Sequence, residues 1–301
     1  MRAHYRAIDF RFTVETDIPG AFATVDRLFA PFRDPFRDAG SGGSGRTYRL
    51  GMSRSEPGLF ELLVDGASIQ RPPSPGSMLD WMIIDVTTEA VTHTADFVCV
   101  HASAATLDGR AIVLPAPPEH GKSTTVAALV RDGWDLLTDE AALFDPRDDL
   151  LHPFPRPMML SDTSMAALPG LAESLPSSYE AFRRLDHHLT ADDLRPGALG
   201  SPARVVFVVF PSYAPGRTTE LVPIGRSEAL MEMIQGTFNM QRVGGSGVET
   251  LGRVVRAADC YRLHIGSLES AVGLIRELFV RDGGERRSQA KAGIGVVVPS
   301  G

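Results

Sequence analysis

The chain has 301 residues, of which 43% are hydrophobic and 22% are charged, and its formal net charge at pH 7 is −7. These values suit a globular protein of one large or two modest domains, and the negative balance gives no electrostatic case for binding nucleic acid or an anionic membrane. Only two cysteines occur, Cys99 and Cys260, both among apolar residues, which excludes a disulfide framework and a cysteine-rich metal site.

The first 95 residues predict a small α+β module. Its start lacks the apolar core of a signal peptide, and no apolar run in the chain is long enough to span a bilayer, so we expect a cytoplasmic protein. The module carries no nucleophile constellation, so we expect a scaffolding or dimerisation role, with capture of a peptide or partner as the alternative. Apolar periodicity gives the order β-α-β-β-α, with strands at 7–15, 46–54 and 59–70, helices at 18–29 and 77–91, and a flexible loop at 33–46.

A second module begins near residue 96 with a predicted hairpin. Residues 97–103 and 110–114 are largely apolar, and the Asp108-Gly109 step between them is a turn signal. Because hairpin partners are antiparallel, we expect a mixed sheet rather than a purely parallel one. His101 lies on the first of these strands, where a histidine is either a satisfied core residue or a group near a reacting phosphate.

The second strand of this hairpin leads into a tight loop and then a helix-like stretch that ends near Asp132. Strand, loop, Gly-Lys-Ser and helix form the context of a phosphate-binding P-loop, in which loop amides and the positive end of the helix face the anion. Lys122 would reach the β- and γ-phosphates of ATP, and the Ser123 hydroxyl would ligate Mg²⁺. The expected nucleotide contacts from the loop and the helix start are Pro118, Glu119, His120, Gly121, Lys122, Ser123 and Thr124.

The loop departs from the usual pattern Gly-x-x-x-x-Gly-Lys-Ser/Thr in two respects. Ala116 stands in place of the first glycine, and Pro117 and Pro118 each lack an amide hydrogen. Taken alone, the loop is therefore also compatible with an ordinary strand-to-helix turn that contains Gly-Lys-Ser.

Two acidic residues interrupt the next strand-like segment. Asp139 and Glu140 directly follow the largely apolar residues 134–138 and directly precede the apolar residues 141–144. We expect a buried strand that delivers both carboxylates to its carboxyl end, which is the edge where ligands bind in open α/β sheets. One acid would hold Mg²⁺, directly or through water, and the other would take the proton from an attacking hydroxyl. A surface turn is the alternative, and the apolar residues on both sides weaken it.

A proline-rich segment follows, in which His152–Pro157 reads His-Pro-Phe-Pro-Arg-Pro. The three prolines stiffen the backbone on either side of Arg156. We expect this guanidinium to contact phosphate or substrate, with an ordinary surface arginine as the alternative.

These features together resemble the HPr-kinase-related proteins, relatives of the bacterial HPr serine kinase/phosphorylase. The resemblance rests on His101 on its strand, Lys122 twenty-one residues later, and the Asp139-Glu140 pair, in the order and spacing of that family. It is strongest over residues 97–160. The loop with two prolines and the proline-rich segment look more like the divergent kinases found beside peptide-modification genes than like HPr kinase itself.

The resemblance implies an HPr-kinase-like P-loop fold, ATP and Mg²⁺ as cofactors, and roles for individual residues. Glu140 falls where the family has its catalytic proton acceptor, Asp139 would be the carboxylate on the metal side, and His101 would lie near the transferred phosphate. HPr kinase has two aspartates at the positions of this acidic pair. The chain has no counterpart of the glycine-rich segment that supplies a further Mg²⁺-binding carboxylate in HPr kinase, which weighs against a reverse phosphorylase activity.

The remainder of the chain predicts further strands and helices. Residues 161–200 are polar and irregular, and we interpret the His187-His188 pair within them as part of a solvated loop, with a mobile lid or acceptor-binding segment as the alternative. The elements expected after it are a buried strand at 203–210, helices at 227–238 and 247–258, a loop at 239–247 that approaches the nucleotide, a strand at 260–265, and a helix from Ser267 to Val280.

We therefore predict an α/β protein with a mixed sheet, consisting of an N-terminal α+β module at 1–95, an HPr-kinase-like P-loop kinase domain at 96–281 and a flexible tail at 282–301. The predicted activity is transfer of the γ-phosphoryl group of ATP to a serine or threonine hydroxyl of a peptide or small protein. A kinase for a small-molecule alcohol and a non-catalytic nucleotide- or partner-binding protein are the alternatives. Homo-oligomerisation is compatible with the sequence.

Overall fold

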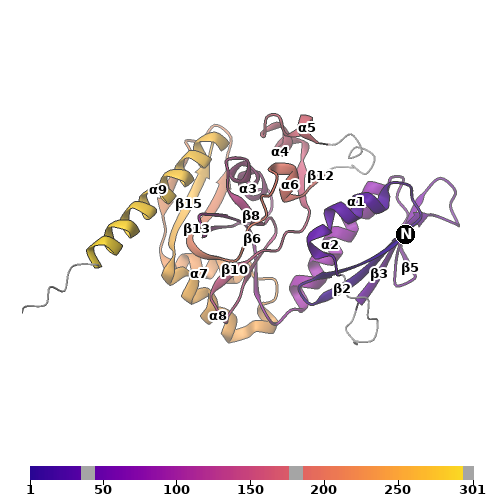
Figure 1. Cartoon of the computed structure of the whole chain (residues 1–301), viewed down its shortest axis with the longest axis horizontal. Coiled ribbons are helices and arrows are strands. Elements are labelled where there is room, and N and C mark those ends of the chain that lie inside the picture. Colours follow the sequence, from indigo (N-terminus) through magenta and orange to yellow (C-terminus); the bar gives the residue numbers. More distant parts are fainter. Residues whose placement is uncertain (35–44, 176–185, 294–301) are drawn as a thin grey trace, which may run out of the picture.

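The computed structural model describes residues 1–34, 45–175 and 186–293. Within this part the chain forms a five-stranded sheet, an eight-stranded sheet and a two-stranded ladder, with helices packed against them (Figure 1). The predicted class, α/β with a mixed sheet, is confirmed, because both larger sheets combine parallel and antiparallel pairs. None of the described helices is both long enough and apolar enough to cross a membrane.

The five-stranded sheet belongs to the N-terminal part of the chain, and its strands are neighbours in sequence order. β2 and β3 run parallel, and the other neighbours are antiparallel. Both predicted helices and the strand predicted at 46–54 are confirmed, whereas the stretch 59–70 forms two antiparallel strands joined at the turn signal Asp65-Gly66 rather than one strand. Residues 35–44 of the predicted loop lie outside the described part. The elements are β1 (Arg2–Ala7), β2 (Phe10–Thr16), α1 (Ala21–Leu28), the 3₁₀ helix η1 (Ala30–Phe32), β3 (Gly45–Met52), β4 (Phe60–Val64), β5 (Ala67–Gln70) and α2 (Pro75–His93).

The prediction of a single strand over residues 7–15 is wrong. The backbone reverses at Ile8, whose φ is 57°, and β1 and β2 form an antiparallel hairpin in which Ala7 pairs with Phe10. The alternation of buried and exposed side chains resumes directly after the two-residue turn, so the pattern reads as one continuous strand. The turn contains no glycine and therefore lacks the strongest hairpin signal.

The eight-stranded sheet begins with the predicted hairpin of β6 (Val98–Leu107) and β7 (Arg110–Pro115). Both β8 and β9 pair with β6 in antiparallel orientation. Residues 139 and 140 therefore lie at the break between two strands that share one partner. The elements that complete this half are α3 (Lys122–Arg131), β8 (Asp135–Thr138), β9 (Ala141–Phe144) and β10 (Leu150–His152).

The second half of this sheet supplies its parallel strands. β13 (Ala203–Tyr213) pairs in parallel with β7 on one side and with β15 (Asp259–Ile265) on the other, and β14 (Glu220–Pro223) adds an antiparallel edge. The carboxyl ends of β7, β13 and β15 consequently meet at one edge, the place where α/β sheets bind ligands. The chain leaves β7 at this edge and enters α3.

Helices cover both faces of the parallel strands. Ile112 and Leu114 of β7 pack with α3 and α9, whereas the alternate residues Ala111 and Val113 pack with α7 and α8. This split follows from the two-residue period of a strand and explains why β7 is apolar without interruption. The covering helices are α7 (Arg226–Gln235), α8 (Met240–Ala257) and α9 (Leu268–Gly293).

Residues 161–200 are more regular than the sequence suggests. The prediction of a solvated loop for His187-His188 is wrong, because both side chains are buried on a strand. His187 lies 2.8 Å from the Asp162 carboxylate, and His188 lies 2.6 Å from the carboxylate of Asp80 on α2. Residues 176–185 lie outside the described part. The elements here are β11 (Met158–Ser161), α4 (Asp162–Ala166), α5 (Leu171–Ser174), β12 (Asp186–Leu189) and α6 (Ala191–Leu194).

Two boundaries near the C-terminus also differ from the prediction. α8 begins at Met240, within the predicted loop, and a kink at Gly244 (φ 50°, ψ −131°) divides it. The glycines of this stretch read as a loop because glycine disfavours helix interiors. α9 extends beyond the expected end at Val280 and reaches Gly293, so the first part of the predicted tail is helical.

The N-terminal part packs directly against the large sheet. Phe154, just after β10, belongs to the same apolar cluster as the N-terminal sheet, and its ring centroid lies 5.5 Å from that of Phe32. The buried Asn239 amide donates to the carbonyls of Thr94 (3.0 Å) and Phe97 (2.8 Å), at the connection between the two parts. Together with the bond from β12 to α2 described above, these contacts fix α2 against the large sheet.

Candidate active site

The loop between β7 and α3 comprises residues 116–121. Its two prolines lack amide hydrogens, so they do not extend the strand ladder. Glu119 (φ 64°) and Gly121 (φ 87°) adopt left-handed backbone conformations that turn the chain into the helix. Lys122 is the first helical residue, and the first amides of the ten-residue α3 have no intrahelical carbonyl to bind. The loop therefore ends in a site that favours an anion.

Two polar side chains fold back onto this loop. Lys122 is buried, and its Nζ donates to the carbonyl of Pro117 at 2.9 Å. The ring of His120 donates from Nδ1 to the carbonyl of Pro118 at 2.8 Å. Pro118 and Glu119 are exposed at the tip. The ammonium group of Lys122 therefore lies on the inner side of the loop, next to the start of α3.

Asp139 and Glu140 lie opposite β6 in the two-residue break between β8 and β9, and the pairing register with β6 is the same on both sides of this break. The Ser103 hydroxyl donates to the carbonyl of Asp139 at 2.9 Å and lies 3.2 Å from its carboxylate. The Thr138 hydroxyl accepts the amides of Glu140 (3.3 Å) and Ala141 (3.2 Å). Hydroxyls from both strands thus bind backbone groups at the break between β8 and β9.

Arg156 and His101 converge on Glu140 from two sides. The Arg156 guanidinium lies 2.9 Å from Glu140 Oε2 and 3.9 Å from Asp139 Oδ2, and its side chain is 7% exposed. His101 Nε2 lies 3.3 Å from Glu140 Oε1. The interpretation of Arg156 as a surface arginine is therefore wrong, and His101 belongs to the same cluster as the acids.

Burial sets the ionisation of this cluster. It raises the pKa of the Asp139 carboxyl to about 6, although Arg156 opposes the shift. It also lowers the pKa of Lys122, against the attraction of Glu140 and Asp139. Burial likewise lowers the pKa of His101, and Glu140 opposes this shift while Lys122 and Arg156 reinforce it. At pH 7 Asp139 is therefore ionised and His101 is neutral.

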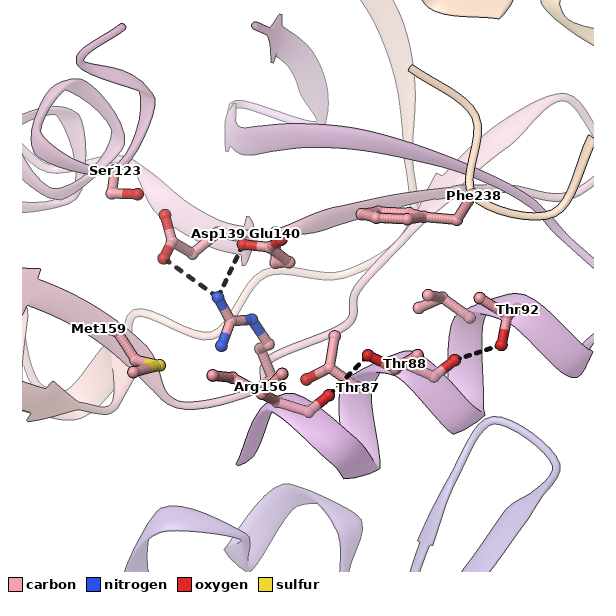
Figure 2. A pocket seen from close by; sticks show the side chains of 11 residues that line it. Thr87, Thr88, Thr92, Ser123, Asp139, Glu140, Arg156, Met159 and Phe238 are labelled. Atoms are coloured by element: carbon pink, nitrogen blue, oxygen red, sulfur yellow. Dashed lines mark hydrogen bonds and ion pairs between the residues drawn. The ribbon is translucent and has the colours of Figure 1, made fainter. Parts of the chain in front are cut away.

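A cavity of about 380 Å³ opens beside the acids, and we call it the acidic cavity. Figure 2 shows Ser123, Asp139, Glu140 and Arg156 along one side and α2 along the other, with Phe238 and Met159 at its ends. Of the two acids, Asp139 is 2% exposed and Glu140 is 31% exposed. Glu140 is thus the carboxylate that a molecule in the cavity can reach more readily.

A second cavity, of about 500 Å³, borders the same helix start, and we call it the hydroxyl cavity. Thr124 and Thr125 of α3 line it together with serine and threonine side chains from β11 and α4. Tyr213, 52% exposed at the end of β13, forms another part of its wall. Thr124 donates to the Ser164 hydroxyl at 2.9 Å. The cavity therefore offers neutral hydrogen-bonding groups and one aromatic ring.

The donor set at the first turn of α3 fits a hard divalent cation. The Ser123 hydroxyl lies beside the Asp139 carboxylate, and Glu140 lies next to it, so three oxygen-bearing side chains gather within reach of the helix start (Figure 2). Mg²⁺ prefers oxygen ligands of this kind. Among the described residues, buried Arg156 Nε and Thr125 Oγ1 have no hydrogen-bond partner, which fits a site that receives further acceptor atoms.

The fold brings together most of the residues that the sequence singles out. Lys122, Ser123, Asp139, Glu140, Arg156 and His101 gather at the start of α3, whereas Thr124 faces the hydroxyl cavity and Glu119 lies at its rim. Sequence reasoning missed Ser103, although its position two residues after His101 on one strand puts both on the same face. It also missed the threonines of α2, which no local pattern connects with the acids.

Comparison with models of known protein families gives no match, and no curated protein matches the chain.

Proposed function

We propose that the chain is an ATP-dependent kinase that transfers the γ-phosphoryl group to a hydroxyl, with a serine or threonine of a peptide or small protein as the acceptor. The observation that carries the proposal is the convergence of Lys122, Ser123, Asp139 and Glu140 at one helix start, although up to eighteen residues separate them in the sequence. Phosphoryl transfer depends mainly on positioning and electrostatics, so a cluster of this composition suffices. The resemblance to HPr-kinase-related proteins supports the same activity.

The nucleotide would lie across the first turn of α3. The helix amides and the Lys122 ammonium bind the β- and γ-phosphates, and this requires Lys122 to leave the carbonyl of Pro117. The hydroxyl cavity takes the ribose and the base, because its threonine and serine side chains suit sugar hydroxyls and Tyr213 offers a stacking surface. The γ-phosphate then points away from this cavity, toward the acids.

Ser123 and Asp139 would hold Mg²⁺, which when bound neutralises charge on the phosphate oxygens. Because the Asp139 pKa is about 6, its carboxylate is available as a ligand at neutral pH. Ser103 holds this carboxylate in place from the adjacent strand.

Glu140 is the residue that takes the proton of the attacking hydroxyl. It is the more exposed acid, and it faces the acidic cavity. Arg156 binds one of its oxygens and His101 the other, and these two contacts orient the carboxylate. Neutral His101 can hydrogen-bond to Glu140 and relay the proton onward.

Binding of Mg·ATP to wild type and to Lys122→Ala, measured by calorimetry, tests this proposal. Loss of charge-assisted hydrogen bonds to phosphate is worth about 1.5–3 kcal/mol, so the variant should bind roughly 10- to 100-fold more weakly. Arg131→Ala is the matched control, because it removes an exposed cation from the other end of the same helix. Equal affinity for ATP in wild type and Lys122→Ala would contradict the proposal.

A further inference from the structure

We propose that α2 of the N-terminal part forms one wall of the acceptor site and that the acceptor is an uncharged hydroxyl compound or residue. The inference rests on the proposed function and extends it from the nucleotide to the second substrate. It assigns the acidic cavity to the acceptor, and it gives the N-terminal part a role in recognition rather than in scaffolding alone.

The position of the cavity supports this assignment. Ser123 at the start of α3 and the exposed carboxylate of Glu140 both line it, so a hydroxyl inside meets the base and the phosphate-binding helix start together. Its volume of about 380 Å³ lies at the lower end of the range for ligand pockets. One amino-acid side chain or a small alcohol fits this space, whereas a folded surface does not.

The wall contributed by α2 is uncharged. Thr87, Thr88 and Thr92 line the cavity, and each hydroxyl donates to a carbonyl one turn earlier on the helix, at 2.7, 2.9 and 2.6 Å respectively. Their donors are therefore occupied, and the surface they offer consists of methyl groups and weak acceptors. Ile84 adds a large apolar side chain that is 55% exposed.

The opposite wall disfavours anions. Two acidic side chains, Asp139 and Glu140, line this wall against one basic side chain, Arg156. The Arg156 guanidinium already faces both carboxylates, so its charge is compensated within the protein, although its Nε still has no hydrogen-bond partner in the described part of the chain. The cavity thus has a negative balance beside an apolar wall, which suits a neutral alcohol.

The position of α2 is fixed, as a substrate-binding wall requires. Asp80 of α2 lies 2.6 Å from buried His188 on β12, and the Asn239 amide donates to the carbonyl of Thr94 directly after the helix.

In the transfer step, the acceptor oxygen forms a bond to the γ-phosphorus while the bond to the bridging oxygen of ADP breaks. ADP leaves with that electron pair, and the hydroxyl proton passes to Glu140.

Matched pairs of acceptors test the inference with the full-length protein, Mg²⁺ and γ-labelled ATP. N-acetylserinamide is compared with N-acetylserine, and glycerol with glycerol 3-phosphate, so that each pair differs by one anionic group. We expect label transfer to the neutral member of at least one pair, at least tenfold faster than to its anionic partner. The first pair represents a residue of a peptide and the second a small alcohol, so the preferred pair identifies the source of the hydroxyl.

Substitutions on α2 that fill the acidic cavity provide a second test of the inference. Thr88→Trp and Ile84→Trp each place an indole at an exposed position that lines the cavity, and both should raise the acceptor KM at least tenfold while the ATP affinity stays within about twofold. Thr24→Trp is the control, because Thr24 lies on α1 and also donates to a carbonyl one turn earlier. Circular dichroism melting curves verify folding.

Three results would overturn the inference: preference for the anionic acceptors, unchanged acceptor KM in both folded tryptophan variants, or no transfer to any acceptor by a protein that binds and hydrolyses ATP. Failure to bind ATP would instead remove the proposed function, and the inference with it.

Discussion

The two cavities at the start of α3 share one helix turn but differ in chemistry. The acidic cavity contains Asp139, Glu140 and Arg156, whereas the hydroxyl cavity is lined by threonine and serine side chains and Tyr213, with Glu119 at its rim. Charge is thus concentrated on the side where a proton would have to move, and neutral hydrogen-bonding groups on the side where a nucleoside would lie. The contrast teaches that the side chains lining each cavity, more than the volume of the cavity, indicate which substrate it receives.

Of the substitutions at the acidic cavity, Glu140→Gln should reduce transfer most severely. The amide keeps the shape but cannot take a proton, so we expect transfer to fall by roughly two to four orders of magnitude, the range for a general base. The affinity of the variant for Mg·ATP should remain within a few-fold of the wild-type affinity, because Glu140 lines the acidic cavity and does not line the hydroxyl cavity. Single-turnover transfer and calorimetry measure the two quantities. A large loss of ATP affinity with normal transfer per bound nucleotide would reverse the assignment of the cavities.

His101→Gln should have a smaller effect on the same side. His101 contacts Glu140 at 3.3 Å and acts through it, so we expect transfer to fall by roughly one to two orders of magnitude. Because the pKa of His101 is lowered, the acid limb that it contributes to the rate lies below its ordinary pKa, and the variant should lose this limb. A histidine that only fills the core predicts normal turnover and a lowered melting temperature instead.

Asp139→Asn separates function from stability. The folded-state pKa of about 6 exceeds the unfolded value of 3.8, so the folded protein binds more protons between about pH 4 and 6. The free energy of unfolding of the wild type therefore falls as the pH rises through this window, and it stays at the lower level above it. The amide cannot ionise, so the variant should melt higher than wild type at pH 8, without nucleotide, and near wild type at pH 4.

The same variant should lose Mg²⁺-dependent transfer, because an amide is a poorer ligand than a carboxylate. Melting curves at the two pH values and a Mg²⁺ titration of activity give both results. A variant that melts lower than wild type at pH 8 would show that the ionised carboxylate stabilises the fold, contrary to the argument from burial.

Tyr213→Ala should give the smallest change in substrate binding, and it should affect the hydroxyl cavity alone. Stacking on a base is worth about 0.5–1.5 kcal/mol, so ATP affinity should fall roughly two- to tenfold with no change in acceptor KM. Tyr213 is 52% exposed, so the substitution should leave the melting temperature nearly unchanged. A change in acceptor KM with unchanged ATP affinity would show that the two cavities have been assigned to the wrong substrates.

Local patterns predict the elements of this site but not their assembly. The β7–loop–α3 order and the interruption of a strand by Asp139 and Glu140 follow from periodicity and turn chemistry within short windows. Arg156 and His101 reach Glu140 only because three separate segments converge, and short windows carry no information about such contacts.

The N-terminal part shows the same limit. The helical period identifies α2, but its threonines border the acids because the helix shares an apolar cluster with the large sheet and because His188 and Asn239, far along the chain, bind it there. The buried His187-His188 pair looks solvated in the sequence because both acidic partners are distant in sequence. Charged and polar residues thus mislead local reasoning wherever the fold supplies their partners.

A crystal structure of the protein with Mg²⁺ and a non-hydrolysable ATP analogue tests the central claim most directly. The account predicts the β- and γ-phosphates at the start of α3 with Lys122 released from Pro117, the metal on Ser123 and Asp139, the base beside Tyr213, and the acidic cavity open next to the γ-phosphate. An analogue bound elsewhere, or one whose base occupies the cavity beside α2, would contradict it.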